Sequence, residues 1–196
     1  MNLLRAFIAV EIPREIRDAV GKAMVPLQKG IGSIVHWVPV ENMHLTLKFL
    51  GDVSAANVEM LSEMLRGEAN LFHCFDLRLS GLGSFPNLKR PRVIYIGIQA
   101  PATLEALQRG IESASRRLGY ESEERGFSPH LTIGSVKHAS RVTASEQQII
   151  RRTLEKTRID LLGTARVDSV HLYKSDLKPT GSVYTRLYSA PLKKNL

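Results

Sequence analysis

A four-residue phrase occurs twice in this chain, as His-Leu-Thr-Leu at 44–47 and as His-Leu-Thr-Ile at 130–133. Side chains of a β-strand alternate between the two faces of a sheet. Each phrase therefore places its histidine and threonine on one face and its two aliphatic residues on the other. The sequence predicts two half-buried strands, one carrying His44 beside Thr46 and the other carrying His130 beside Thr132.

The chain around each phrase repeats one order of elements: a strand, a helix, the histidine strand, a second helix and a further strand. Corresponding landmarks are 86 to 88 positions apart, which indicates a duplicated unit rather than two accidental tetrapeptides. The expected strands of the first copy are 5–11, 44–49 and 75–80, and those of the second are 92–98, the segment that begins at His130, 165–173 and 183–189.

The expected helices have recognisable starts. Pro13 and Pro101 each open a segment with an apolar stripe. Ser54 is the expected N-cap of a third helix, and Thr143 with Glu146 forms the capping box of a fourth.

These patterns predict an α+β fold. We expect a single bilobal domain over residues 1–196, with an internal repeat of approximately 5–81 and 92–189. Each copy would cover one sheet face with helices and leave the other face free. The predicted architecture is therefore two antiparallel-type sheets with outer helices around a central cleft, related by a pseudo-two-fold axis, with His44 and His130 on opposite sides of the cleft.

A turn-rich stretch at 81–87, which contains two glycines and ends in Pro86-Asn87, indicates a loop. Phe85 in this stretch would either rim the cleft as a stacking ring or fill the core. Of the histidines outside the phrases, His171 shares a predicted strand face with Tyr173, so it either approaches the cleft or is solvated.

Composition narrows the function classes. A net charge of +8 favours polyanionic partners. Cys74 is the only cysteine, so no internal disulfide can form, and its apolar neighbours predict a buried thiol. No apolar run is long enough to span a bilayer and no export signal is visible, so we expect a cytoplasmic protein with no membrane contact.

No metal or nucleotide motif accompanies the two phrases. The chain has no His-Glu-x-x-His and no paired cysteines, no cluster of acidic residues accompanies the histidines outside the phrases, and Gly81-Leu82-Gly83 lacks the rest of a nucleotide-binding loop. We therefore expect neither a metal site nor a cofactor.

Two histidine–threonine pairs suit the opening of a cyclic phosphodiester. A water must lose a proton as it attacks phosphorus, and the ribose oxygen opposite must gain one as it leaves. Histidine can serve either role near neutral pH, and each threonine can donate a hydrogen bond to a phosphate oxygen. One histidine must be neutral while the other is charged, which predicts a bell-shaped pH profile.

Five stretches resemble the RNA 2′,3′-cyclic phosphodiesterases, or 2′-5′ RNA ligase-like proteins, of the two-histidine (2H) phosphoesterase superfamily. These stretches are RAFIAVEIP at 5–13, HWVPVENMHLTLKFLGDV at 36–53, GLGSFPNLKRPRVIYIGI at 81–98, FSPHLTIGSVK at 127–137 and LYKSDLKPTGSVYTRL at 172–187. The resemblance runs nearly end to end and implies a bilobal α+β fold with the site between the lobes.

The resemblance also implies an activity. It implies metal-free hydrolysis of RNA 2′,3′-cyclic phosphate ends to 2′-phosphates, with His44 as proton donor, His130 as proton acceptor, and Thr46 and Thr132 as phosphate-binding residues. The substrates would be RNA ends, with tRNA fragments and cyclic nucleotides as candidates, and we expect a monomer because the cleft is complete within one chain.

The sequence departs from the family at two positions. The family often has arginine where this chain has His36 and Ser135. Lys48 could supply the missing charge because it continues the His44 and Thr46 face, and Arg125 or Lys137 are further candidates. Phe127, just before the second phrase, would either stack on a base or pack in the core.

Two alternatives stay open at this point. Reversible 2′-5′ ligation of tRNA halves is the first, since some family members perform it. A non-catalytic module that binds RNA ends is the second, and it fits the charge and the aromatic residues. This alternative does not explain why histidine and threonine occupy the same positions in both phrases.

Overall fold

Two antiparallel sheets form the centre of the molecule. The computed structural model describes residues 3–137, 142–179 and 181–194 of the chain. The first sheet contains, in spatial order, β3 (His44–Ser54), β1 (Leu3–Glu11), β8 (Ser169–Lys178) and β9 (Gly181–Pro191). The second sheet contains β2 (Val35–Trp37), β6 (His130–Val136), β5 (Val93–Gln99), β4 (Phe75–Phe85) and β7 (Gly163–Val167). The predicted α+β fold with two antiparallel sheets is confirmed.

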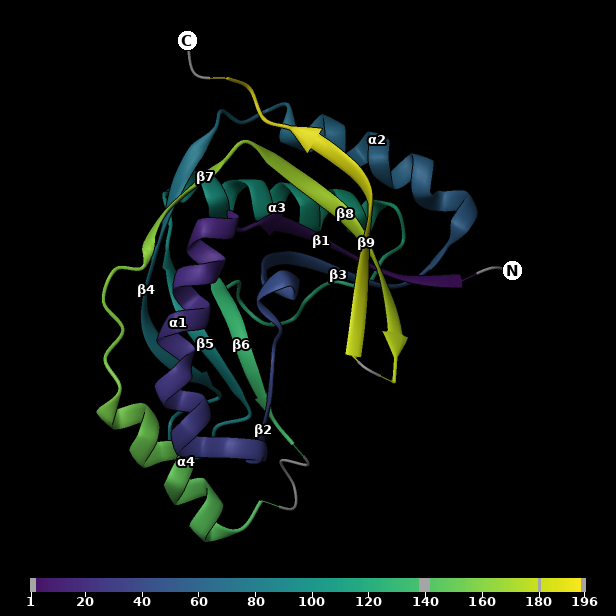
Figure 1. The fold of residues 1–196 in the computed structure, drawn as a ribbon. Helices are drawn as coiled ribbons and strands as arrows, with labels where there is room; N and C mark the ends of the chain where they lie inside the picture. The colour runs from purple at the N-terminus through teal and green to yellow at the C-terminus, as the bar shows by residue number, and fades with distance from the viewer. Residues whose placement is uncertain (1–2, 138–141, 180, 195–196) are drawn as a thin grey trace.

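Four helices lie in two pairs outside the sheets (Figure 1). One pair is α1 (Arg14–Ile31) with α4 (Ala144–Lys156), and α1 also contacts β7 of the second sheet. The other pair is α2 (Val58–Ala69) with α3 (Ala102–Arg117), which contact β9 and β3 of the first sheet respectively. Short 3₁₀ helices complete the connections: η1 (Gly32–Ile34), η2 (Val40–Asn42) and η3 (Ala55–Asn57).

Amphipathic spacing explains the helices. The buried residues of α1 recur every three or four positions, so one stripe faces the core: Ile16, Val20, Met24, Leu27 and Ile31. Pro13 and Pro101 directly precede α1 and α3 as predicted. The predicted capping box at α4 is confirmed, because Thr143 and Glu146 each accept a hydrogen bond from the other's backbone N–H.

Each sheet combines strands from both halves of the sequence. β1 pairs with β3 from its own half and with β8 from the other half. β5 likewise pairs with β6 from its own half and with β4 from the first half. Each sheet is therefore built from both ends of the chain, and the two histidine strands, β3 and β6, contact one another between the sheets.

Three local expectations were wrong. Ser54 is not the N-cap of α2: it ends β3 and occupies the N-cap position of η3 without a side-chain cap hydrogen bond, and Asn57 occupies the N-cap position of α2. The segment 165–173 is not one strand: β7 ends at Val167 and β8 begins at Ser169, and the two belong to different sheets. The stretch 81–85 is not a loop but the end of β4, with a register shift between Ser80 and Leu82.

The core is aliphatic and continuous across both sheets and the helices. Cys74, expected to be buried, is half-buried and packs against this core. Among the helices of the described residues, none combines the length and apolar character that a bilayer crossing requires.

Candidate active site

Both histidine–threonine pairs line one cavity of about 380 Å³. β3 contributes His44 and Thr46, and β6 contributes His130 and Thr132. The cavity therefore receives one pair from each sheet, as the predicted central cleft requires. The remaining lining residues are Arg5, Ala6, Phe7, Val38, Asn42, Phe49, Gly51, Ser175, Ser182 and Tyr184.

Matching backbone contacts orient the two imidazoles. The Nδ1 atom of His44 lies 2.8 Å from the carbonyl oxygen of Asn42, and the Nδ1 atom of His130 lies 2.7 Å from that of Ser128. A carbonyl oxygen only accepts, so Nδ1 carries the proton and donates it in both rings. The neutral form of each histidine therefore leaves Nε2 unprotonated and available for proton transfer.

Aromatic rings surround both histidines. The ring of Phe7 stacks on His44 at a centroid distance of 4.7 Å, and Tyr184 meets it edge-on at 5.2 Å. Phe85 meets His130 edge-on at a centroid distance of 4.9 Å. Of the two positions expected for Phe85, the one beside the site is therefore observed rather than the one in the core. Burial among these groups lowers the pKa of His44, and the hydrogen bond to Asn42 opposes this effect by favouring the charged ring.

The strands that carry the phrases share a distortion. β1 and β3 shift register between Ile8 and Ala9, which leaves Leu47 as an extra residue, and β5 and β6 shift at the equivalent place, leaving Ile133. The first seven residues of β3 and all seven of β6 have the same order of burial. A bulge reverses the faces that follow it, so the last residue of each phrase and the residue after it both face inward.

This bulge overturns the expectation for Lys48. Lys48 is 3% exposed and does not line the cavity. Its ammonium forms an ion pair with Glu112 at 2.8 Å and a hydrogen bond to the carbonyl oxygen of Glu121. The exposed residue that the bulge places on the cavity side is Phe49. Lys48 therefore joins β3 to the segment after α3 and lies outside the cavity that it was expected to line.

The other candidate contacts also lie elsewhere. Phe127 packs against the core, which was the second of its two expected positions. Arg125 and Lys137 are exposed and do not line the cavity. The two family departures, His36 and Ser135, face each other as a pair between β2 and β6.

Sequence reasoning missed Arg5. It lies on β1 and lines the cavity together with Phe7, which is two residues away on the same face. The signal was available, because alternation along 5–11 places Arg5 opposite the apolar residues that enter the core.

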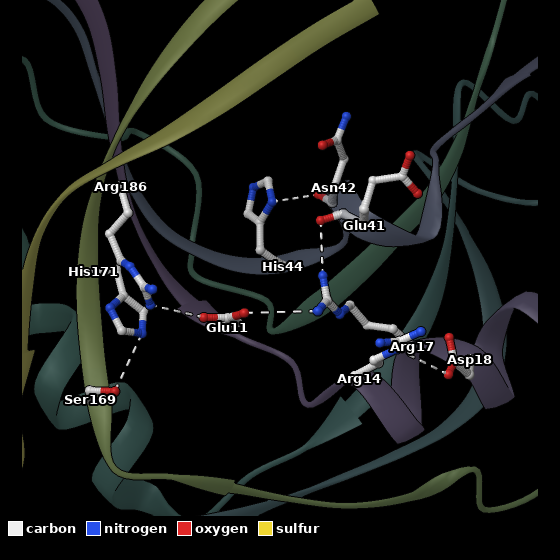
Figure 2. Close-up of polar contacts among 10 residues, drawn as sticks. All are labelled: Glu11, Arg14, Arg17, Asp18, Glu41, Asn42, His44, Ser169, His171 and Arg186. Carbon is white, nitrogen blue, oxygen red and sulfur yellow. Dashed lines mark hydrogen bonds and ion pairs between the residues drawn. The ribbon is translucent and has the colours of Figure 1, made fainter.

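A polar network lies next to His44 (Figure 2). Arg17 donates a hydrogen bond to the carbonyl oxygen of Glu41, the residue before Asn42, and it forms an ion pair with Glu11. Glu11 also pairs with Arg186 at 3.2 Å. These charged groups line a second cavity of about 210 Å³, and His44 lines both cavities. The hydrogen bond from Arg17 to Glu41 holds the backbone next to Asn42, whose carbonyl oxygen orients the His44 ring.

His171 is a structural histidine. Its Nδ1 atom lies 2.8 Å from the hydroxyl of Ser189, its Nε2 atom lies 3.3 Å from that of Ser169, and it is outside the cavity. Burial lowers its pKa, and the nearby Arg186 adds to this effect. Within residues 3–137, 142–179 and 181–194, no three histidine, cysteine, aspartate or glutamate side chains are grouped so that they could hold a metal ion.

A family model described as LigT-like phosphoesterase matches the chain twice, over residues 10–95 and 96–184. Each stretch contains one His-x-Thr-x phrase. The chain belongs to the LigT-like phosphoesterase family. Its relatives in this family include RNA 2′,3′-cyclic phosphodiesterases of Methanothermobacter thermautotrophicus (32% identity, 93% of this chain and 95% of the relative) and Thermotoga maritima (30% identity, 98% of each).

Solved structures of similar proteins agree with the fold. A Thermus thermophilus protein superposes with a TM-score of 0.80 at 28% identity, covering 98% of this chain and 100% of that one. Escherichia coli LigT in complex with 3′-AMP superposes with a TM-score of 0.75 at 27% identity, covering 98% and 99%.

Proposed function

We propose that this LigT-like protein hydrolyses 2′,3′-cyclic phosphodiesters at RNA ends to 2′-phosphomonoesters, without a metal ion, by acid–base catalysis from His44 and His130. The observation that carries the proposal is that two imidazoles, each with Nδ1 held by a carbonyl, line one cavity with two threonine hydroxyls. This set provides a proton acceptor, a proton donor and two donors for phosphate oxygens.

The reaction uses Nε2 of both rings. His130, neutral, accepts a proton from water as the water oxygen bonds to phosphorus. The bond from phosphorus to O3′ breaks, and His44, protonated, gives its Nε2 proton to O3′. Thr46 and Thr132 donate hydrogen bonds to the non-bridging oxygens as negative charge on them grows. Afterwards His130 is charged and His44 is neutral, and exchange of one proton with solvent restores the starting state.

The nature of the substrate is supported by charge and by the relatives. The chain carries a net charge of +8, which attracts polyanions such as RNA. Relatives that match over more than nine-tenths of this chain bear the name RNA 2′,3′-cyclic phosphodiesterase, and the E. coli relative has been crystallised with 3′-AMP. A ribonucleotide substrate is therefore consistent with what is known of similar proteins.

Turnover of adenosine 2′,3′-cyclic phosphate in the presence of EDTA tests the proposal. The wild type should form adenosine 2′-phosphate, and His44→Ala or His130→Ala should each lower kcat at least about 100-fold, the range for general acid–base catalysis. His171→Ala provides a histidine control, because this side chain lies outside the cavity. Wild-type turnover by both cavity variants would refute the mechanism.

The same assay separates the alternatives. Binding of RNA ends without turnover would favour a non-catalytic module. Adding a second RNA with a 5′-hydroxyl and finding a 2′-5′ junction would reveal ligation, in which that hydroxyl replaces water as the nucleophile.

A further inference from the structure

Arg5 is a cation in the cavity that pairs with no other described residue. It is exposed, and among the cavity-lining residues in the described part of the chain it is the only arginine or lysine. None of the described residues forms a hydrogen bond or an ion pair with its guanidinium. Asp52 is the residue opposite Arg5 on β3, but the two side chains form no ion pair. The guanidinium is therefore available to an anionic ligand in the cavity.

The position of Arg5 sets which anion it can meet. Arg5 is four residues along β1 from Ala9, which pairs with Thr46. At a rise of about 3.3 Å per residue the two positions are about 13 Å apart. Side chains stand roughly perpendicular to a sheet, so Arg5 does not reach a phosphate bound by Thr46. Its anion lies farther along the ligand, on the next backbone group.

Phe49 occupies the space between these two positions. It pairs with Phe7, and its side chain is 66% exposed although it lines the cavity. The ring centroids of Phe49 and Phe7 are 6.3 Å apart, and Phe7 in turn stacks on His44. An exposed aromatic ring beside a phosphate site is suited to stacking of a nucleobase.

We propose that Arg5 and Phe49 bind the terminal nucleotide of an RNA chain, with its base stacked on Phe49 and the phosphodiester on its 5′ side paired with Arg5. This inference rests on the proposed function, since it places the cyclic phosphate between the two histidines. The RNA then leaves the cavity past Arg5. An RNA end, which has that phosphodiester, is bound more tightly than a nucleoside cyclic phosphate, which lacks it.

The described residues at the equivalent positions of the opposite lobe do not form a matching subsite. Phe7 pairs with Phe49 in the first sheet, and Val93 pairs with Ser135 at the matching place in the second. Phe7 of β1 thus corresponds to Val93 of β5. Two residues earlier along each chain segment, Arg5 corresponds to Pro91, which is buried. Among the described residues that line the cavity, the guanidinium and the exposed ring therefore occur on the β1–β3 side alone.

The test compares two substrates that differ in one phosphodiester. These are adenosine 2′,3′-cyclic phosphate and the dinucleotide ApA ending in a 2′,3′-cyclic phosphate. Arg5→Ala should lower kcat/KM for the dinucleotide about 10- to 100-fold, mainly through KM, the range for a hydrogen bond to a charged group. For the mononucleotide kcat/KM should change by less than about threefold. Arg5→Lys should retain part of the preference.

Phe49→Ala should lower kcat/KM for both substrates, because both carry the stacked base, and Phe49→Trp should restore it. Arg152→Ala is the matched charge control. Arg152 is exposed on α4, away from the cavity, and no described residue pairs with it. This variant removes one positive charge and should leave both substrates unaffected.

Two results would overturn the subsite. One is an equal loss on both substrates in Arg5→Ala, and the other is a loss on the dinucleotide no greater than in Arg152→Ala. Failure of the proposed function looks different, because the wild type would then turn over neither substrate. Calorimetric binding of ApA with a terminal 2′-phosphate tests the subsite in that case, and Arg5→Ala should weaken this binding and reduce its salt dependence.

Discussion

The two imidazoles differ in their surroundings although their hydrogen bonds match. His44 is enclosed by Phe7 and Tyr184, and desolvation there disfavours the charged ring and lowers its pKa. In the proposed mechanism His44 must be protonated when substrate is bound. The anionic cyclic phosphate supplies the compensation, because a nearby negative charge raises the pKa of an imidazole. In this mechanism, substrate binding therefore raises the pKa of His44 and favours its protonated form.

We predict that the pKa of His44 in the ligand-free protein lies below the ordinary value of 6.5 and rises when an anion occupies the cavity. NMR titration of the imidazole resonance, assigned with His44→Gln, measures both values. Inorganic phosphate or adenosine 2′-phosphate serves as the anion. A His44 pKa at or above 6.5 without ligand would contradict the burial argument, and no rise on binding would contradict a phosphate beside this ring.

The sign of this shift has a kinetic consequence. A donor must carry its proton, so kcat/KM, which reports the free enzyme, falls as pH rises through the lowered pKa of His44. The profile of kcat reports the bound complex, in which the pKa of His44 is higher. As pH rises, kcat/KM should therefore begin to fall at a lower pH than kcat.

At the scale of elements, the bulge after each phrase decides which side chains face the cavity. Lys48 enters the interior because Leu47 is the extra residue, and its ammonium bonds to Glu112 and to the carbonyl oxygen of Glu121. β3 and the segment that follows α3 are thereby joined. We therefore expect Lys48 to stabilise this junction rather than to bind substrate.

Replacing Lys48 by methionine should lower the free energy of unfolding by about 2–3 kcal/mol, because it leaves the carboxylate of Glu112 partly buried without its partner. Because Lys48 does not line the cavity, kcat/KM should stay within about threefold of wild type. Denaturant unfolding measures the first quantity. The double variant with Glu112→Gln should recover part of the loss. A large fall in kcat/KM with intact stability would return Lys48 to the candidate substrate contacts.

The sequence predicted local features well and long-range pairing poorly. Strict alternation identified His44, Thr46, His130 and Thr132, and the capping box at Thr143 was visible because all its atoms lie within one turn. Lys48 was misplaced because counting by twos assumes an unbroken strand, and a bulge has no sequence signature here. Arg5 was overlooked although alternation separated it from the core-facing residues, because only the packed structure shows that this face of β1 lines the cavity.

On the scale of the whole molecule, reciprocal strand exchange joins the two lobes. β8 from the C-terminal part completes the first sheet, and β4 from the N-terminal part completes the second. Such pairings join residues that are distant in sequence, so neither periodicity nor spacing could have predicted them. The break at Asp168, where the chain passes from one sheet to the other, was missed for the same reason.

Because each sheet needs strands from both halves, we predict that the lobes unfold as one cooperative unit. Trp37, the only tryptophan, lies on β2 of the second sheet and reports on that lobe by fluorescence. Hydrogen exchange of β1 and β8 amides reports on the first sheet. Both probes should give the same midpoint in denaturant, and two separate midpoints would show that the lobes are independent.

The unequal walls of the cavity have a stereochemical consequence. A cleft with true two-fold symmetry would accept a ribose cyclic phosphate in two opposite poses. The flipped pose would present O2′ to the proton donor and yield the 3′-phosphate regioisomer. The two poses differ in energy because equivalent positions of the two lobes carry different residues: Phe49 corresponds to Ser135, and Arg5 corresponds to Pro91. The proposed mechanism therefore predicts a single isomer, because the two copies of the unit differ at the positions next to the reacting groups.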